Sequence, residues 1–283
     1  MSGARATGQA GPNAGLATRA QVVSALRSAQ KSNRGAAGYS RWVNRPLGRQ
    51  AAALAYLRGL SPNQVSLLSA ACTFPGIALI AAAPPTWLTA IIVTVLLVAG
   101  YALDSADGQV ARLRGGGSPD GEWLDHVLDS AKIAVVHLAV AISWFRFFAL
   151  PSAWVLVPLA FGAVSTVFFF AQVLADMIRR VERVRAGGSG VTTSRVNPNE
   201  PAPVLRSLVV LPNDYGVLCL LMLLLPVSVA FQSIYTVFLA ANALFLVVGS
   251  MRWFREMRAL REPAESQPEP APAVAVPTGG RSA

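Results

Sequence analysis

The stretch that decides the fold contains 45 residues and no charged side chain. Residues 59–103 read GLSPNQVSLLSAACTFPGIALIAAAPPTWLTAIIVTVLLVAGYAL. A helix needs about 20 apolar residues to cross the hydrocarbon core of a bilayer, so this stretch is long enough for two crossings. The turn Pro84-Pro85-Thr86 divides it. The sequence therefore predicts transmembrane helices near 64–83 and 87–107.

Further apolar stretches extend the same pattern along the chain. One runs from about 126 to 146, another covers 151–175 without a charge, and the last covers 215–251. The last stretch is too long for one crossing, so we expect it to fold back near Ala230–Ser233 and form two helices. The expected fold is an all-α integral membrane protein with six transmembrane helices.

The composition excludes other classes of protein. Hydrophobic residues make up 53% of the chain and charged residues only 13%, about half of the usual charged share of a soluble domain. A single soluble globular domain and disorder along the whole chain are both excluded. The two cysteines, Cys72 and Cys219, lie inside apolar stretches and predict packing, not a disulfide or zinc framework.

The distribution of basic residues predicts the orientation in the membrane. The chain has 24 basic and 14 acidic residues, and the basic ones flank the apolar stretches. If both termini are cytosolic, 22 of the 24 lie on the inner side, as the positive-inside rule requires. We therefore expect a multi-pass protein with cytosolic N- and C-termini and no nucleic-acid partner.

The two ends of the chain differ from its apolar centre. We expect a disordered, basic N-terminal arm over 1–40, a membrane domain over 41–262 and a disordered Pro/Ala-rich tail over 263–283. Residues 22–58 suit a juxtamembrane amphipathic helix lying on the anionic inner leaflet. Its arginines would then face lipid phosphates or would only enforce the orientation: Arg41, Arg45, Arg49 and Arg58.

Four acidic residues surround the junction of the second and third predicted spans. With about 100° of rotation per helical residue, Asp104 and Asp107 share one helical face, and Asp125 and Asp129 share one face of the next helix. A glycine-rich turn, Gly115-Gly116-Gly117, joins the two helices as an antiparallel pair. The four carboxylates are therefore expected to converge at the cytosolic mouth of the bundle.

Such a group of acids predicts divalent cations. Four carboxylates cannot all stay ionised together at a site of low dielectric constant without cations. Oxygen ligands in this number suit Mg²⁺ or Mn²⁺, and two such ions form a clamp for phosphoryl-type chemistry. Three nearby residues are small where a diphosphate would approach: Gly108, Ala111 and Gly121. Arg112 offers a guanidinium to phosphate. A single Asp at a helix end often only caps the helix or faces water, but the full spacing favours a site for a nucleoside diphosphate.

The segment Asp104–Asp129 resembles the signature of the CDP-alcohol phosphotransferase family, D-x2-D-G-x2-A-R-x8-G-x3-D-x3-D. Every signature position is matched over these 26 residues. Residues 61–66, Ser-Pro-Asn-Gln-Val-Ser, also look like the start of the first span in that family, and six spans is the family count. The resemblance implies an integral membrane enzyme, often a homodimer, that moves a substituted phosphate from a CDP-alcohol to an acceptor hydroxyl and releases CMP.

The resemblance also implies roles for the signature residues. Four would bind two Mg²⁺ or Mn²⁺ ions: Asp104, Asp107, Asp125 and Asp129. Asp129 would also be the general base. Four would contact the CDP part: Gly108, Ala111, Arg112 and Gly121. CDP-diacylglycerol is the expected donor, in phospholipid biosynthesis. The alternatives are CDP-choline/ethanolamine-type transfer to a lipid acceptor and, from another class, a divalent-cation-binding membrane transporter.

A few charged residues near the signature have open roles. Lys132, one turn beyond Asp129, would either hold part of the acceptor or balance the acidic charge. His126 is a weak candidate for a metal ligand. Arg179 or Arg180 could reach an anionic acceptor, whereas Asp214 could simply lie at a helix N-terminus.

Overall fold

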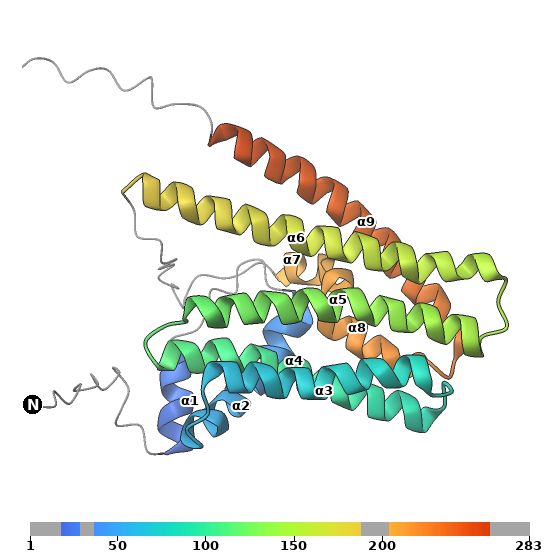
Figure 1. Ribbon diagram of the computed structural model, residues 1–283, viewed down its shortest axis with the longest axis horizontal. Helices are drawn as coiled ribbons and strands as arrows, with labels where there is room; N and C mark the ends of the chain where they lie inside the picture. Colours follow the sequence, from blue (N-terminus) through green and yellow to red (C-terminus); the bar gives the residue numbers. More distant parts are fainter. Residues whose placement is uncertain (1–17, 29–36, 188–203, 261–283) are drawn as a thin grey trace, which may run out of the picture.

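The computed structural model describes residues 18–28, 37–187 and 204–260, and within these ranges every regular element is a helix (Figure 1). The α-helices and the short 3₁₀ or π turns, labelled η, are α1 (Arg19–Ser28), η1 (Ser40–Asn44), α2 (Arg45–Leu57), α3 (Pro62–Ala82), α4 (Trp87–Leu113), α5 (Pro119–Phe147), η2 (Ser152–Val155), α6 (Leu156–Arg185), α7 (Val204–Val209), η3 (Leu211–Asn213), α8 (Tyr215–Leu221), η4 (Met222–Leu224) and α9 (Ser228–Ala259). The all-helical prediction is confirmed for this part of the chain.

Five of the described helices are long and apolar enough to cross a membrane. They are α3, α4, α5, α6 with its leading turn η2, and α9. The expected count of six is not confirmed, because the segment predicted as the fifth span is helical only over Tyr215–Leu224, which is too short to cross alone. The chain folds back just after this segment and not near Ala230–Ser233, so that α9 is a single helix of 32 residues.

The predicted starts of α3 and α4 lie within two residues of the observed ones. Ser61 caps α3, its hydroxyl accepting from the Gln64 N–H while the Gln64 side chain accepts from the Ser61 N–H. Thr86 caps α4 in the same way by accepting from the Thr89 N–H. α4 and α5 extend further than the apolar pattern, since their acid-bearing ends remain helical on both sides of the Gly115–Gly116 turn.

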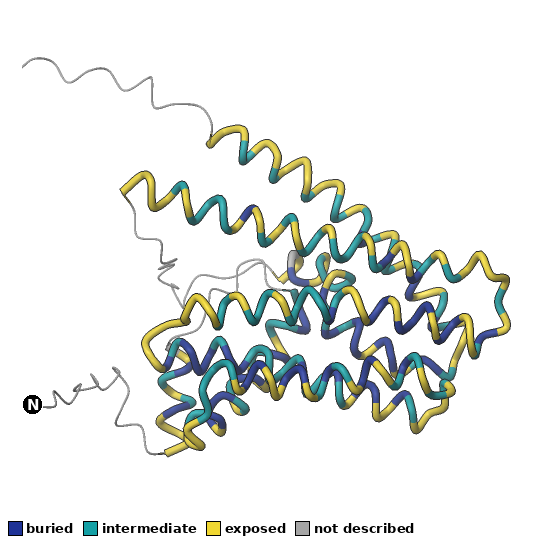
Figure 2. Tube along the Cα trace, viewed as in Figure 1, coloured by how far each residue is buried: buried dark blue, intermediate teal, exposed yellow. Residues whose placement is uncertain are grey.

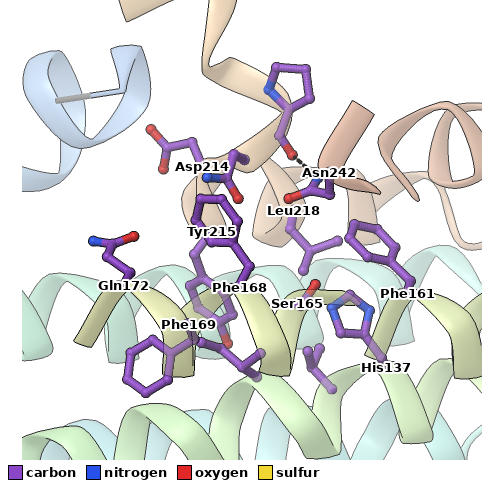
Figure 3. A pocket seen from close by; sticks show the side chains of 14 residues that line it. His137, Phe161, Ser165, Phe168, Phe169, Gln172, Asp214, Tyr215, Leu218 and Asn242 are labelled. Carbon is purple, nitrogen blue, oxygen red and sulfur yellow. Dashed lines mark hydrogen bonds between the residues drawn. The ribbon is translucent and has the colours of Figure 1, made fainter. Parts of the chain in front are cut away.

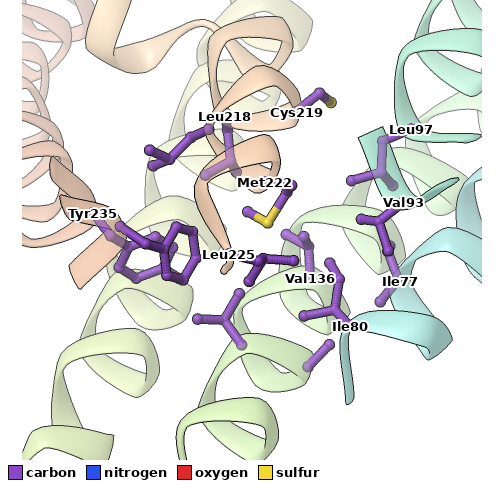
Figure 4. Packing of buried hydrophobic residues seen from close by; sticks show 14 of the residues in the cluster. Ile77, Ile80, Val93, Leu97, Val136, Leu218, Cys219, Met222, Leu225 and Tyr235 are labelled. Atoms are coloured by element: carbon purple, nitrogen blue, oxygen red, sulfur yellow. The ribbon is translucent and has the colours of Figure 1, made fainter. Parts of the chain in front are cut away.

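Close packing of α3 against α4 and α5 builds the dense part of the bundle. The Ser69 hydroxyl donates to the Gly100 carbonyl oxygen at 2.8 Å. A Cβ atom on Gly100 would lie 2.0 Å from the Thr73 Oγ1, so the two helices approach at a distance that only glycine allows. A cluster of buried apolar side chains from α3, α4, α5, α8 and α9 fills the part of the bundle remote from the α4–α5 turn (Figure 4).

The N-terminal helices lie beside the α4–α5 turn. The single helix expected over 22–58 is two helical segments, α1 and η1–α2, and α2 packs against α4. Arg41, Arg45 and Arg49 are only partly exposed, and apolar side chains such as Trp42 of η1 and Leu47 of α2 are exposed. The single amphipathic helix is therefore not confirmed, and contact of these arginines with lipid phosphates stays a prediction. Most of the expected tails, 1–17 and 261–283, lies outside the described residues.

Candidate active site

Three of the four predicted carboxylates form a compact cluster. Ligand oxygens of Asp104, Asp107 and Asp125 all lie within 4.8 Å of one another. Asp104 and Asp107 belong to α4 and Asp125 to α5, and the two helices are joined by the turn at Gly115 and Gly116, whose positive φ angles of 98° and 138° suit glycine. The glycine-rich turn expected from the sequence therefore brings the acids of α4 and α5 together.

A serine of α3 contributes to this cluster. The Ser66 hydroxyl donates to the Asp107 carboxylate at 2.6 Å, and both residues are buried. The Gly108 N–H also donates to the Asp107 carboxylate. No local pattern around Ser66 indicates this role, although the residue lies in the second turn of the helix that Ser61 caps. Two donors therefore hold the deepest of the three carboxylates.

The fourth predicted carboxylate, Asp129, lies beside Asp104 but outside the cluster of three. Asp129 is not among the residues whose ligand oxygens lie within 4.8 Å of one another. Instead, the buried Lys132 ammonium forms ion pairs with both Asp129, at 2.9 Å, and Asp104. The interpretation that Lys132 balances acidic charge agrees with this geometry.

The chemistry of the cluster fits a divalent cation. Carboxylate oxygens are hard ligands of the kind that Mg²⁺ and Mn²⁺ prefer. Three carboxylates this close repel one another unless positive charge lies between them. Lys132 supplies an ion pair to Asp104. Asp104, Asp107 and Asp125 are therefore the residues that would hold such an ion.

The small residues of the signature differ in what surrounds them. A Cβ atom on Gly108 would meet only the Arg112 guanidinium, at 3.5 Å, so the space in front of Gly108 is open. The Arg112 Nε is buried without a hydrogen-bond partner among the described residues. Ala111, by contrast, is buried. A Cβ on Gly121 would lie 2.9 Å from Asn63 Oδ1 at the end of a flexible side chain, so a larger residue there requires Asn63 to shift.

The other charged candidates have partners of their own. Arg180 pairs with Glu122 at 2.8 Å, and Arg179 binds Glu256 through two contacts of 2.7 and 2.8 Å. His126 lies 3.9 Å from Glu122 and is not part of the described carboxylate cluster.

Asp214 lies at a helix N-terminus, as expected, and also binds a residue from a distant segment. It caps α8 by accepting from the Gly216 N–H, and it also accepts from the Ser40 N–H at 2.8 Å and from the Ser40 hydroxyl at 3.2 Å. The Ser40 hydroxyl is in turn 2.7 Å from the Tyr101 hydroxyl on α4, one turn before Asp104. This network ties η1 and α8 to the acid-bearing helix. It joins residues 174 positions apart, which no local sequence pattern reveals.

Comparisons with known proteins place these helices in context. The sequence matches the family described as CDP-alcohol phosphatidyltransferase over residues 59–248, more than half of the chain and all of α3, α4 and α5. Among solved structures, the chain is similar to the Mycobacterium tuberculosis phosphatidylinositol phosphate synthase in complex with manganese and citrate, at 20% identity. That similarity covers 75% of this chain and 89% of the other, with a TM-score of 0.48. No curated protein matches the chain.

Proposed function

Because the chain belongs to the CDP-alcohol phosphatidyltransferase family, we propose that it transfers a phosphatidyl group from CDP-diacylglycerol to an acceptor hydroxyl and releases CMP. The family and the apolar helices identify a multi-pass membrane enzyme, a phosphotransferase of phospholipid synthesis that uses a CDP-alcohol. A transporter is set aside, since this family consists of transferases. The choice of CDP-diacylglycerol as donor is the proposal.

One observation supports the proposal above others. The Asp104, Asp107 and Asp125 carboxylates meet within 4.8 Å on two adjacent helices, beside the open space in front of Gly108 and the unpartnered Nε of Arg112. The oxygen ligands for cations therefore lie next to an open space that suits a diphosphate. The Arg112 guanidinium lies beside the same space. We propose that these carboxylates, with Asp129 at the edge, hold two Mg²⁺ or Mn²⁺ ions. When bound, such ions neutralise the diphosphate and the departing CMP.

Asp129 is the proposed general base. It lies one helical turn beyond Asp125 on α5, outside the three-carboxylate cluster, and its position is held by Lys132. An acceptor hydroxyl has a pKa far above 7 and needs a base beside it when it attacks phosphorus. The Asp129 carboxylate accepts that proton, and Lys132 keeps the carboxylate oriented.

Replacing Asp129 with asparagine tests this role. Asp129→Asn keeps the shape of the side chain and removes the basic oxygen, so CMP release should fall by about 10²–10⁴-fold. Binding of the CDP donor should stay within a few-fold of the unmodified enzyme. Release and donor affinity are measured at saturating metal. The matched control is Asp176→Asn, because the Asp176 side chain is 61% exposed and contacts only Arg179 in the described contacts. If Asp129→Asn keeps more than about a tenth of the activity, the base lies elsewhere, with Asp125 the next candidate.

The orientation is part of the proposal and has its own test. We place the α4–α5 turn, both termini and the end of α6 on the cytosolic side, because the basic residues gather there. In a chain without Cys72 and Cys219, Ala186→Cys should react with an impermeant thiol reagent only from the cytosolic side. Ser152→Cys, at the other end of α6, should react only from outside. The reverse pattern overturns the orientation. Homodimer formation also remains a prediction.

A further inference from the structure

A cavity of about 170 Å³ lies between α5, α6, α9 and the start of α8 (Figure 3). Aromatic and aliphatic side chains such as Phe161, Phe168 and Leu218 form much of its wall. Polar groups interrupt this wall: Ser165, Gln172, Asn213 and Asn242. The Asn242 amide donates both hydrogens to backbone carbonyls, of Pro212 and Phe238, so its own carbonyl oxygen is left as an acceptor. An apolar wall with a few fixed polar groups is typical of a small-molecule site.

The cavity adjoins the catalytic carboxylates. Ile133 lines it and lies one turn beyond Asp129, on the same face of α5. Tyr215 lines it as well and lies within electrostatic range of both Asp104 and Asp129. A molecule in the cavity thus lies about one helical turn from the proposed base.

The Tyr215 hydroxyl lacks a strong hydrogen-bond partner in the described part of the chain. It is buried and has no hydrogen-bond partner among the described residues. The Cys219 thiol lies near it on the same helix, but sulfur is a weak acceptor. The ring is held edge-on against Tyr101, with centroids 5.3 Å apart, one turn before Asp104. A buried hydroxyl without a strong partner is costly, and a small rotation of the ring toward the cavity would let a bound alcohol supply one.

The charges around the cavity select against an anionic ligand. Among the described residues that line it, none is a lysine or arginine. The single carboxylate of the wall, Asp214, already accepts three hydrogen bonds from Ser40 and Gly216. Lys132 is paired with two acids, and Arg179 and Arg180 with Glu256 and Glu122. A phosphate placed here would lose its hydration without gaining a cation.

We propose that this cavity is the acceptor site and that the acceptor is an uncharged alcohol, positioned by the Tyr215 hydroxyl. The inference rests on the proposed function. The acceptor oxygen attacks the donor phosphorus that carries the alcohol group, and a new P–O bond forms. The bond from that phosphorus to the bridging oxygen breaks, and this oxygen leaves with CMP. The acceptor proton passes to Asp129. The alcohol can come from water, as a small polyol, or from the membrane, as the head of a neutral lipid.

Matched acceptors test the proposal with CDP-diacylglycerol as donor. One arm compares glycerol with glycerol 3-phosphate and inositol with inositol 1-phosphate, and a second arm offers diacylglycerol in mixed micelles. We expect an uncharged acceptor in one arm to raise CMP release above the rate with water, and at least tenfold more than any phosphorylated one. A faster phosphorylated acceptor overturns the proposal. So does the absence of acceleration by every uncharged acceptor while the donor still binds. If the donor does not bind in the presence of metal, the proposed function itself fails.

Two variants locate the effect in the cavity. Tyr215→Phe removes only the hydroxyl and should raise KM for the acceptor about tenfold while KM for the donor changes less than twofold, a split that a general loss of structure would not produce. Ser165→Phe fills the cavity and should lower the acceptor-dependent rate at least tenfold with donor binding retained. The control is Val167→Phe on the outer face of α6, where Val167 is 53% exposed. Unchanged acceptor kinetics in both cavity variants overturn the proposal.

Discussion

The helices α3, α4 and α5 and the helices α6 and α9 are similarly apolar, yet they are packed very differently. Between 33% and 44% of the apolar window is buried inside the molecule in the first three helices, against 11% in each of the other two. Figure 2 shows the same contrast along the chain. Hydropathy therefore identifies helices that can cross a membrane, but does not tell which of them form the core and which face outward.

Small and polar side chains account for the difference. α3 and α4 meet through Gly100, Ser69 and Thr73, and α4 and α5 meet through their acids and Lys132. Lipid tails are as apolar as leucine, so apolar area alone does not hold helices together in a bilayer. On α6 and α9 the outward leucines and valines have no such partners in the described contacts, and an ion pair, Arg179–Glu256, joins the two helices near one end.

The largest expected effect on stability separates a core leucine from an outward one. Leu97 on α4 is 1% exposed and Leu244 on α9 is 63% exposed. Leu97→Ala leaves a cavity and should lower the free energy of unfolding by about 2–5 kcal/mol. Leu244→Ala should change it by less than about 0.5 kcal/mol. Denaturant unfolding of the detergent-solubilised variants measures both. Equal losses would mean that α9 is packed as tightly as α4.

A smaller effect is expected from the ion pair that joins α6 and α9. The Arg179 side chain is 28% exposed, so solvent screens its pairing with Glu256. Arg179→Ala should lower the free energy of unfolding by about 0.2–1 kcal/mol, and the loss should shrink at high salt. The same measurement on Glu256→Gln is the control, since it removes the other half of the pair. A loss above about 2 kcal/mol would show that the pair is a major support of the bundle.

Much of the fold could be predicted because it follows local rules. The charge-free stretch and Pro84-Pro85 predict α3 and α4, and the caps at Ser61 and Thr86 begin them. The helical spacing of the acids and the glycine turn likewise predict the meeting of Asp104, Asp107 and Asp125. Each of these signals lies within a few residues of the structure that it determines.

The features that the sequence left unpredicted have different causes. The fifth predicted span begins at Tyr215 as expected but ends at Leu224, just before Pro226, which cannot continue a helix. The inward turn of Arg45 follows from the packing of Gly48 against Ser105 on α4, where a Cβ atom would lie 2.7 Å from the serine hydroxyl. The break at Pro226 is a local signal, whereas the position of Arg45 depends on tertiary packing, which the sequence pattern leaves open.

The measurement that tests the account most directly is CMP release from CDP-diacylglycerol with and without divalent metal. The purified enzyme in detergent is assayed with acceptor and Mg²⁺ or Mn²⁺, then with excess EDTA, and then with metal restored. Since three carboxylates within 4.8 Å need cations to work together, release should fall to background with the chelator and return with the metal. Full CMP release in excess EDTA would contradict the claim that these aspartates form a metal-dependent phosphotransferase site.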